Sequence, residues 1–155
     1  MNIYLDTSAL MKLYPYETGS KDLLSILHQN ADDLILTISD ITRTEFHSAF
    51  LRRVRTKEIE LEATYKIFEA FEHDLKMFNI IKVDDTVKQL SLILLDNIAH
   101  QKGLRTLDAF QLSAALFCNQ FIHIDIFVSS DQKFLNVAKD FFSIFDPEKN
   151  KLKLC

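Results

Sequence analysis

Short, continuous apolar segments alternate along the chain with longer stretches in which apolar residues recur every three or four positions. The short segments lie at 3–5, 34–36, 80–83, 126–128 and 143–145. Because they are unbroken, they are typical of strands that helices cover on both faces. The alternation predicts a three-layer α/β/α fold with a central, mostly parallel sheet of four to five strands. The length predicts one domain, residues 1–155.

The longer stretches carry the spacing of amphipathic helices. One contains Phe46, Ala49, Phe50 and Val54, and another contains Leu107, Phe110, Ala114 and Phe117. A third is predicted over 86–101, with Asp84 and Asp85 as a capping pair and Gly103 beyond its end. The polar tail from Glu148 to Lys153 is expected to fray.

Composition narrows the class of protein. Hydrophobic residues make up 48% and charged residues 26%, an ordinary globular balance. The formal net charge of -4 has the wrong sign for binding nucleic acid by bulk charge alone, although a local basic strip remains compatible with it. Cys118 and Cys155 fit no zinc spacing and indicate a reduced chain. No basic leader and no apolar stretch of about 20 residues occurs, which predicts a cytoplasmic protein without a membrane segment.

Four acids lie at positions where a shared site is expected. Asp6 directly follows the first predicted strand and Asp131 follows the fourth, so both belong to the carboxyl edge of the sheet, where open parallel sheets bind ligands. Glu45 borders an apolar helical stripe, and Asp108 stands within the apolar run from Leu107 to Leu112. Carboxylates at the margins of buried faces need a partner, and a shared cation would supply one.

Each acid also has a structural interpretation. Asp6, Asp108 and Asp131 fall where helices are predicted to begin, Asp108 in the first turn after Thr106 as N-cap, and acids are favoured there. Glu45 fits an exposed position of an amphipathic helix. As a set without competing His or Cys ligands, however, the four suit Mg²⁺ or Mn²⁺. A pair of such ions about 4 Å apart activates a water and stabilises the leaving oxygen of a phosphodiester.

Four segments carry a resemblance to a known family. They are 3–14 with the following 17–20, 38–46, 104–115 and 128–135. In this order the sequence resembles the PIN-domain superfamily, and specifically the ribonuclease toxins of VapBC-type toxin–antitoxin pairs, over essentially the whole chain. The resemblance implies a PIN-like fold and a metal site made by Asp6, Glu45, Asp108 and Asp131. It implies that Asp6 and Asp108 are the main direct ligands and that Ser8 orders the first carboxylate.

The same resemblance implies an endoribonuclease that uses Mg²⁺ or Mn²⁺, is held inactive by a cognate antitoxin and forms a homodimer. The interval between Asp108 and Asp131 is longer than is usual in the family and lacks a glycine before the fourth strand, so Asp125 is the alternative fourth acid. Arg52, two turns from Glu45, and Arg105, three residues before Asp108, are candidates for contacting RNA phosphates. Arg105 is equally suited to pair with an acid of an antitoxin.

Three other functions stay open. A PIN-domain nuclease of RNA processing would need no antitoxin. A phosphohydrolase could use Asp6 as nucleophile, although Ser8 stands where such enzymes carry a second acid. A non-catalytic binding module would have no need of the four acids. The five histidines show no ligand spacing, and no glycine-rich phosphate loop is present, which disfavours nucleotide cofactors.

Overall fold

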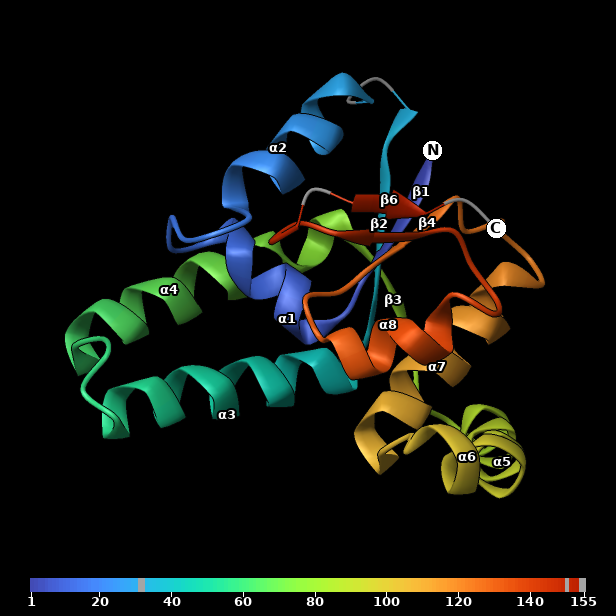
Figure 1. The fold of residues 1–155 in the computed structure, drawn as a ribbon. Helices are drawn as coiled ribbons and strands as arrows, with labels where there is room; N and C mark the ends of the chain where they lie inside the picture. The colour runs from blue at the N-terminus through green and yellow to red at the C-terminus, as the bar shows by residue number, and fades with distance from the viewer. Residues whose placement is uncertain (31–32, 150, 154–155) are drawn as a thin grey trace.

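A central sheet separates two groups of helices in the computed structural model (Figure 1). The structure describes residues 1–30, 33–149 and 151–153, so Cys155 lies outside the described residues. In this part of the chain the sheet has six strands in the order β3-β2-β1-β4-β5-β6. The strands are β1 (Asn2–Leu5), β2 (Ile35–Ser39), β3 (Phe78–Ile81), β4 (Ile126–Val128), β5 (Ile144–Asp146) and β6 (Lys151–Lys153).

The predicted mostly parallel sheet is confirmed. Strands β1 to β5 pair in parallel, with Ile3 opposite Leu36 of β2 on one side and opposite Ile126 of β4 on the other. The predicted third strand is shifted, because β3 begins at Phe78, whose backbone pairs with β2. Strand β6 was not predicted. It pairs antiparallel with β5, so part of the polar tail that was expected to fray forms an edge strand.

The helices follow the predicted alternation with the strands. Their bounds are α1 (Thr7–Leu10), α2 (Ser20–Gln29), α3 (Ile41–Arg55), α4 (Leu61–Asp74), α5 (Asp85–Leu94), α6 (His100–Lys102), α7 (Thr106–Asn119) and α8 (Gln132–Ala138). A π-helical turn, Leu95–Ala99, joins α5 to α6, and Asp84 caps α5 through the N–H of Val87. The helix predicted over 86–101 is therefore present. No helix in the described ranges is long and apolar enough to cross a membrane.

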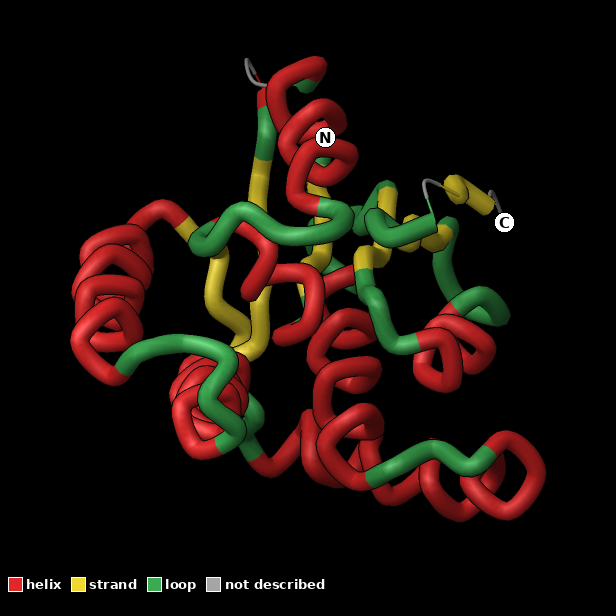
Figure 2. The backbone as a smooth tube through the Cα atoms, turned by 60° about the vertical axis from the view of Figure 1, so that its left-hand side comes forward, coloured by secondary structure: helices red, strands yellow, loops and turns green. Residues whose placement is uncertain are grey.

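Alternate residues of the strands pack into two cores, one on each face of the sheet. Tyr4, Phe127 and Ile144 belong to the core beneath α5, α7 and α8. Ile3 and Val128 belong to the core beneath α1 to α4, which also holds Phe46, Phe50, Phe68 and Phe71. Figure 2 shows the helices on either side of the strands. The unbroken apolar segments of β1 and β4 follow from this arrangement, since both faces of these central strands are covered.

Candidate active site

Asp6 and Asp131 both lie at the carboxyl edge of the sheet, each at the start of a helix that follows a central strand. Asp6 is the N-cap of α1, directly after β1, and Asp131 is the N-cap of α8, after the neighbouring strand β4 (Figure 1). Ser129 joins them: its hydroxyl donates to Asp6 Oδ2 at 2.6 Å and accepts from the backbone N–H of Asp131 at 3.0 Å. The parallel pairing of β1 with β4 therefore brings together two acids that are 125 positions apart.

Asp6 is almost fully buried, with 5% of its surface exposed. Its carboxylate accepts hydrogen bonds from the hydroxyls of Ser8, at 2.8 Å, and Ser129, and from the backbone N–H of Ala9 at 2.8 Å. Loss of hydration nevertheless dominates, and together with the nearby charge of Glu45 it raises the pKa of Asp6 to about 6. Three donors are thus insufficient to compensate for burial of this negative charge.

Glu45 projects from α3 and is held by two side chains from other elements. Thr7 Oγ1 donates to Glu45 Oε2 at 2.8 Å, and Gln111 Nε2 donates to the same oxygen at 2.6 Å. The sequence reasoning missed Gln111, which is 3% exposed on α7. A polar amide within the otherwise apolar run Leu107–Leu112 was the signal that could have found it.

Asp108 lies in the first turn of α7, and both Asp108 and Asp131 form ion pairs with the side chain of Arg105. Arg105 Nε donates to Asp108 Oδ2 at 2.7 Å, and its terminal nitrogen pairs with Asp131 Oδ2. Arg105 also occupies the N-cap position of α7, which had been predicted for Thr106, the first helical residue. Burial raises the pKa of Asp108 in spite of Arg105.

Asp131 differs from Asp108 in its titration. Burial opposes ionisation, but the backbone N–H groups of Phe134 and Lys133, with the Arg105 guanidinium, hold the pKa of Asp131 below its ordinary value. The pKa of Arg105 is raised by hydrogen bonds from its guanidinium to Asp108 and Asp131. Asp131 thus acts as a helix cap as well as an acid of the carboxyl edge.

The charge of Glu45 acts on Asp6, and the charge of Asp131 acts on Asp108. Within the described residues, no group of three or more Asp, Glu, His or Cys side chains stands close enough together to hold a metal ion as the side chains lie. The donor chemistry fits a hard cation, since the functional groups are carboxylates and the burial of Asp6 is uncompensated. Arg105 supplies the positive charge between Asp108 and Asp131, so a cation in contact with both would have to displace its side chain.

Two other residues that the sequence offered for the site, Asp125 and Arg52, lie away from the four acids. Asp125 directly precedes β4, at the amino edge of the sheet, where its carboxylate accepts the backbone N–H of Asn2 at 2.7 Å. The structure therefore separates this alternative fourth acid from the carboxyl edge. Arg52 is exposed in the last turn of α3, and its side chain makes no ion pair with the described acids. Seven residues of helix place it about 10 Å along the axis from Glu45.

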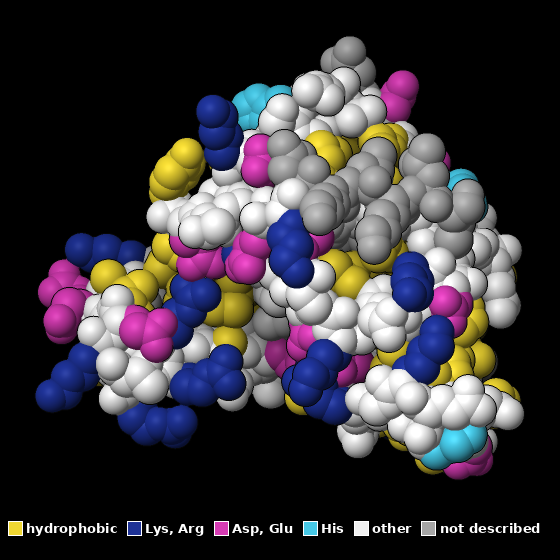
Figure 3. Space-filling view, in the orientation of Figure 1, with side chains coloured by type: hydrophobic (Ala, Val, Ile, Leu, Met, Phe, Trp, Pro, Cys, Tyr) yellow, Lys and Arg dark blue, Asp and Glu magenta, His cyan; other side chains and the backbone are white. Residues whose placement is uncertain are grey.

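Charged side chains are spread over the face shown in Figure 3. Acidic and basic side chains lie side by side near the centre, over the region of α7 and α8, and further basic side chains surround the far end of α3. Arg52, Arg53 and Arg55 are in the last turn of α3. Positive charge is thus available beside the acidic edge in spite of the net charge of -4.

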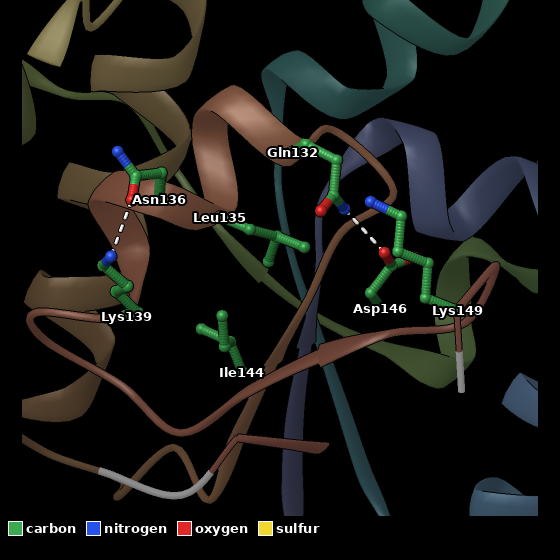
Figure 4. A pocket seen from close by; sticks show the side chains of 7 residues that line it. All are labelled: Gln132, Leu135, Asn136, Lys139, Ile144, Asp146 and Lys149. Atoms are coloured by element: carbon green, nitrogen blue, oxygen red, sulfur yellow. Dashed lines mark hydrogen bonds between the residues drawn. The ribbon is translucent and has the colours of Figure 1, made fainter. Parts of the chain in front are cut away.

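A cavity of about 180 Å³ lies between α8 and β5. Figure 4 shows that polar side chains in it are already paired: Gln132 Nε2 donates to Asp146 at 2.6 Å, and Lys139 Nζ donates to Asn136 at 2.6 Å. The four acids do not line this cavity. The candidate site is therefore the open carboxyl edge.

Comparison with known proteins agrees with this fold. The family model described as PIN domain matches residues 3–140. No curated protein matches the chain in sequence. Among solved structures, the chain is similar to VapBC2 from Rickettsia felis bound to a DNA fragment from its promoter, with a TM-score of 0.65, 18% identity and coverage of 94% of this chain and 100% of that chain.

Two further structures have the same likeness. FitAcB from Neisseria gonorrhoeae has a TM-score of 0.67 at 17% identity and covers 94% of this chain and 97% of that one. VapC20 from Mycobacterium tuberculosis, described as a sarcin-ricin loop cleaving toxin, has a TM-score of 0.65 at 12% identity, with 87% and 94% covered. At these identities the likeness is one of fold.

Proposed function

This chain belongs to the PIN domain family, and we propose that it is a metal-dependent endoribonuclease that hydrolyses RNA phosphodiester bonds by a metal-activated water. The proposal treats residues 1–155 as one nuclease domain. The observation that carries it is the uncompensated burial of Asp6, whose pKa is raised to about 6 at the carboxyl edge of the sheet. Strongly perturbed carboxylates at such an edge are typical of functional sites.

The four acids would have different roles at the metal site. Asp6 and Asp108 would be the main direct ligands of Mg²⁺ or Mn²⁺, and Glu45 and Asp131 would hold bridging waters or a second ion. The bound cation would lower the pKa of a water and stabilise the leaving oxygen. Ser8 and Ser129 orient Asp6 by hydrogen bonds.

RNA would approach along positive charge. Arg52, exposed at the end of α3, and Arg105, beside Asp108, are the candidates for phosphate contacts. Ser8, whose hydroxyl contacts Asp6, is the third candidate for contacting RNA. Guanidinium groups suit phosphate because they offer paired donors. If the metal displaces Arg105 from the two acids, its guanidinium becomes available to the phosphate next to the cation.

We further propose that the protein is the toxin of a toxin–antitoxin pair, with a cognate antitoxin as partner, and that it acts in the cytoplasm as a homodimer. The support is the fold shared with VapBC2 and with VapC20, which is described as a sarcin-ricin loop cleaving toxin. The phosphohydrolase alternative is less well supported, because Ser8 stands where such enzymes carry a second acid.

Cleavage of RNA in Mg²⁺ or Mn²⁺ by wild type, Asp6→Asn, Asp108→Asn and Asp131→Asn tests the proposal. The exposed Asp96 on the π-helical turn provides the control Asp96→Asn. We expect wild type and the control to cleave RNA, with loss of activity in the three site variants and in EDTA. Cleavage that persists in EDTA, or that all three site variants retain, contradicts the proposal. An aspartyl-phosphate on Asp6 would establish the phosphohydrolase instead.

A further inference from the structure

We propose that Gln111 is a positioning residue of the site, which fixes the Glu45 carboxylate in one orientation. The inference rests on the proposed function, since it assigns to Glu45 a role in holding the cation or its water. Gln111 lies on α7, three residues after Asp108, with its side chain buried beneath the acidic edge. Residues three apart on a helix share a face, so Asp108 and Gln111 serve the same side of α7.

The Gln111 amide joins three elements around Glu45. Nε2 lies 2.6 Å from Glu45 Oε2, 3.0 Å from Thr42 Oγ1 and 3.2 Å from Thr7 Oγ1. Thr42 and Glu45 belong to α3, whereas Thr7 follows Asp6 in α1. One buried amide thus connects the elements that carry Asp6, Glu45 and Asp108.

The hydrogen-bond partners at the two ends of the Gln111 amide determine which end faces Glu45. The hydroxyl of Tyr4, which is fully buried and stacked on Phe127, donates to Gln111 Oε1 at 2.7 Å. Turning the amide over would place Oε1 against the negative Glu45 Oε2, where two acceptors repel each other. The N–H groups therefore face Glu45.

The consequence for Glu45 is a division between its two oxygens. Thr7 and Gln111 both donate to Oε2, so Oε1 is the oxygen that this inference assigns to a cation or to its water. An apolar side chain of similar volume would avoid the cost of burying an amide in this position. The amide is retained, on this inference, because outer hydrogen bonds orient metal-binding carboxylates.

The test compares Gln111→Met, which keeps length and volume without donors, with Gln111→His. A neutral histidine offers one N–H to Glu45 and one acceptor nitrogen to Tyr4, which repeats the pattern of the amide. Gln89→Glu, at an exposed position of α5, is the control for a surface change. Urea unfolding establishes that each variant is folded.

We expect Gln111→Met to weaken Mn²⁺ binding, measured by calorimetry, and to lower kcat for RNA, each by about 10-fold or more, with KM changed less than about threefold. Gln111→His should recover part of the Mn²⁺ affinity and part of kcat. If Gln111 served only to pack the core, methionine would be tolerated at least as well as histidine. If wild type binds Mn²⁺ and cleaves RNA and Gln111→Met does both equally well, the positioning role is overturned alone. If wild type does neither, the proposed function fails and this inference fails with it.

Discussion

Replacing Asp6 by asparagine should stabilise the metal-free protein at neutral pH. Burial raises the pKa of this carboxyl from 3.8 to about 6. At 1.36 kcal/mol for each pKa unit, the folded protein carries an ionised Asp6 at a cost of about 3 kcal/mol above pH 6. Asparagine has nearly the same shape and no charge, and its Oδ1 can still accept the N–H of Ala9 that Asp6 accepts at 2.8 Å.

The pH dependence gives the sign of the effect. Because the folded carboxyl holds its proton more tightly than the unfolded one, wild-type stability falls as the pH rises from about 4 to about 6, and the loss is complete above that range. Asparagine does not titrate, so its advantage should grow over the same range. With Oδ1 retained, Ser8 can still donate to it, but the new amide nitrogen takes the place of Oδ2 and reverses the bond with Ser129. This reversal reduces the gain to about 1–3 kcal/mol at pH 7.5.

Urea unfolding in EDTA, from pH 4.5 to pH 7.5, measures this difference for wild type, Asp6→Asn and the exposed control Asp96→Asn. Added Mn²⁺ should then stabilise wild type and the control much more than Asp6→Asn, and only wild type and the control should cleave RNA. A stability difference that does not change with pH would refute the electrostatic reasoning. So would an Asp6→Asn protein that is less stable than wild type at pH 7.5.

Two shorter predictions concern cations. Arg105→Gln should raise Mn²⁺ affinity severalfold in calorimetry, because the guanidinium that pairs with Asp108 and Asp131 competes with the metal; unchanged or weaker binding would contradict this. Lys12→Met should lower the free energy of unfolding, measured in urea, by about 2 kcal/mol. Lys12 is only 4% exposed, and the substitution removes its ammonium group, which lies 2.7 Å from Glu148 Oε1. An unchanged stability would argue against a role for that ion pair.

The parts of the fold that are encoded locally could be predicted from the sequence. Continuous apolar segments located five strands, and the acids that follow β1 and β4 cap helices as their positions indicated. Strand β6 could not be predicted, because it has a single apolar residue between two lysines and forms through backbone pairing with β5. The end of β2 and the start of β3 shifted because pairing between strands, rather than the apolar pattern, sets where a strand begins and ends.

The side chains that surround the acids depend on contacts between distant segments. Gln111 meets Glu45 across 66 positions, and Arg105 meets Asp131 across 26. No spacing rule connects such residues, so the sequence could name the acids without naming what orients them. Asp125 and Asp131, in contrast, could be separated from the local pattern: the segment predicted as a strand, 126–128, coincides with β4, so Asp125 precedes the strand and Asp131 follows it.

Helix capping alone does not account for the acids. An acid that serves only as a cap should be stabilised in its charged form by the N–H groups it accepts, and Asp131 behaves in this way, with its pKa lowered. Asp6 also caps a helix, yet its pKa is raised, and Asp108 remains raised although it pairs with Arg105. A fold selected for stability alone would replace such residues, since neutral side chains of similar shape avoid the cost. The proposed cation would balance the charge of both acids, and the Mn²⁺ titrations test whether it does.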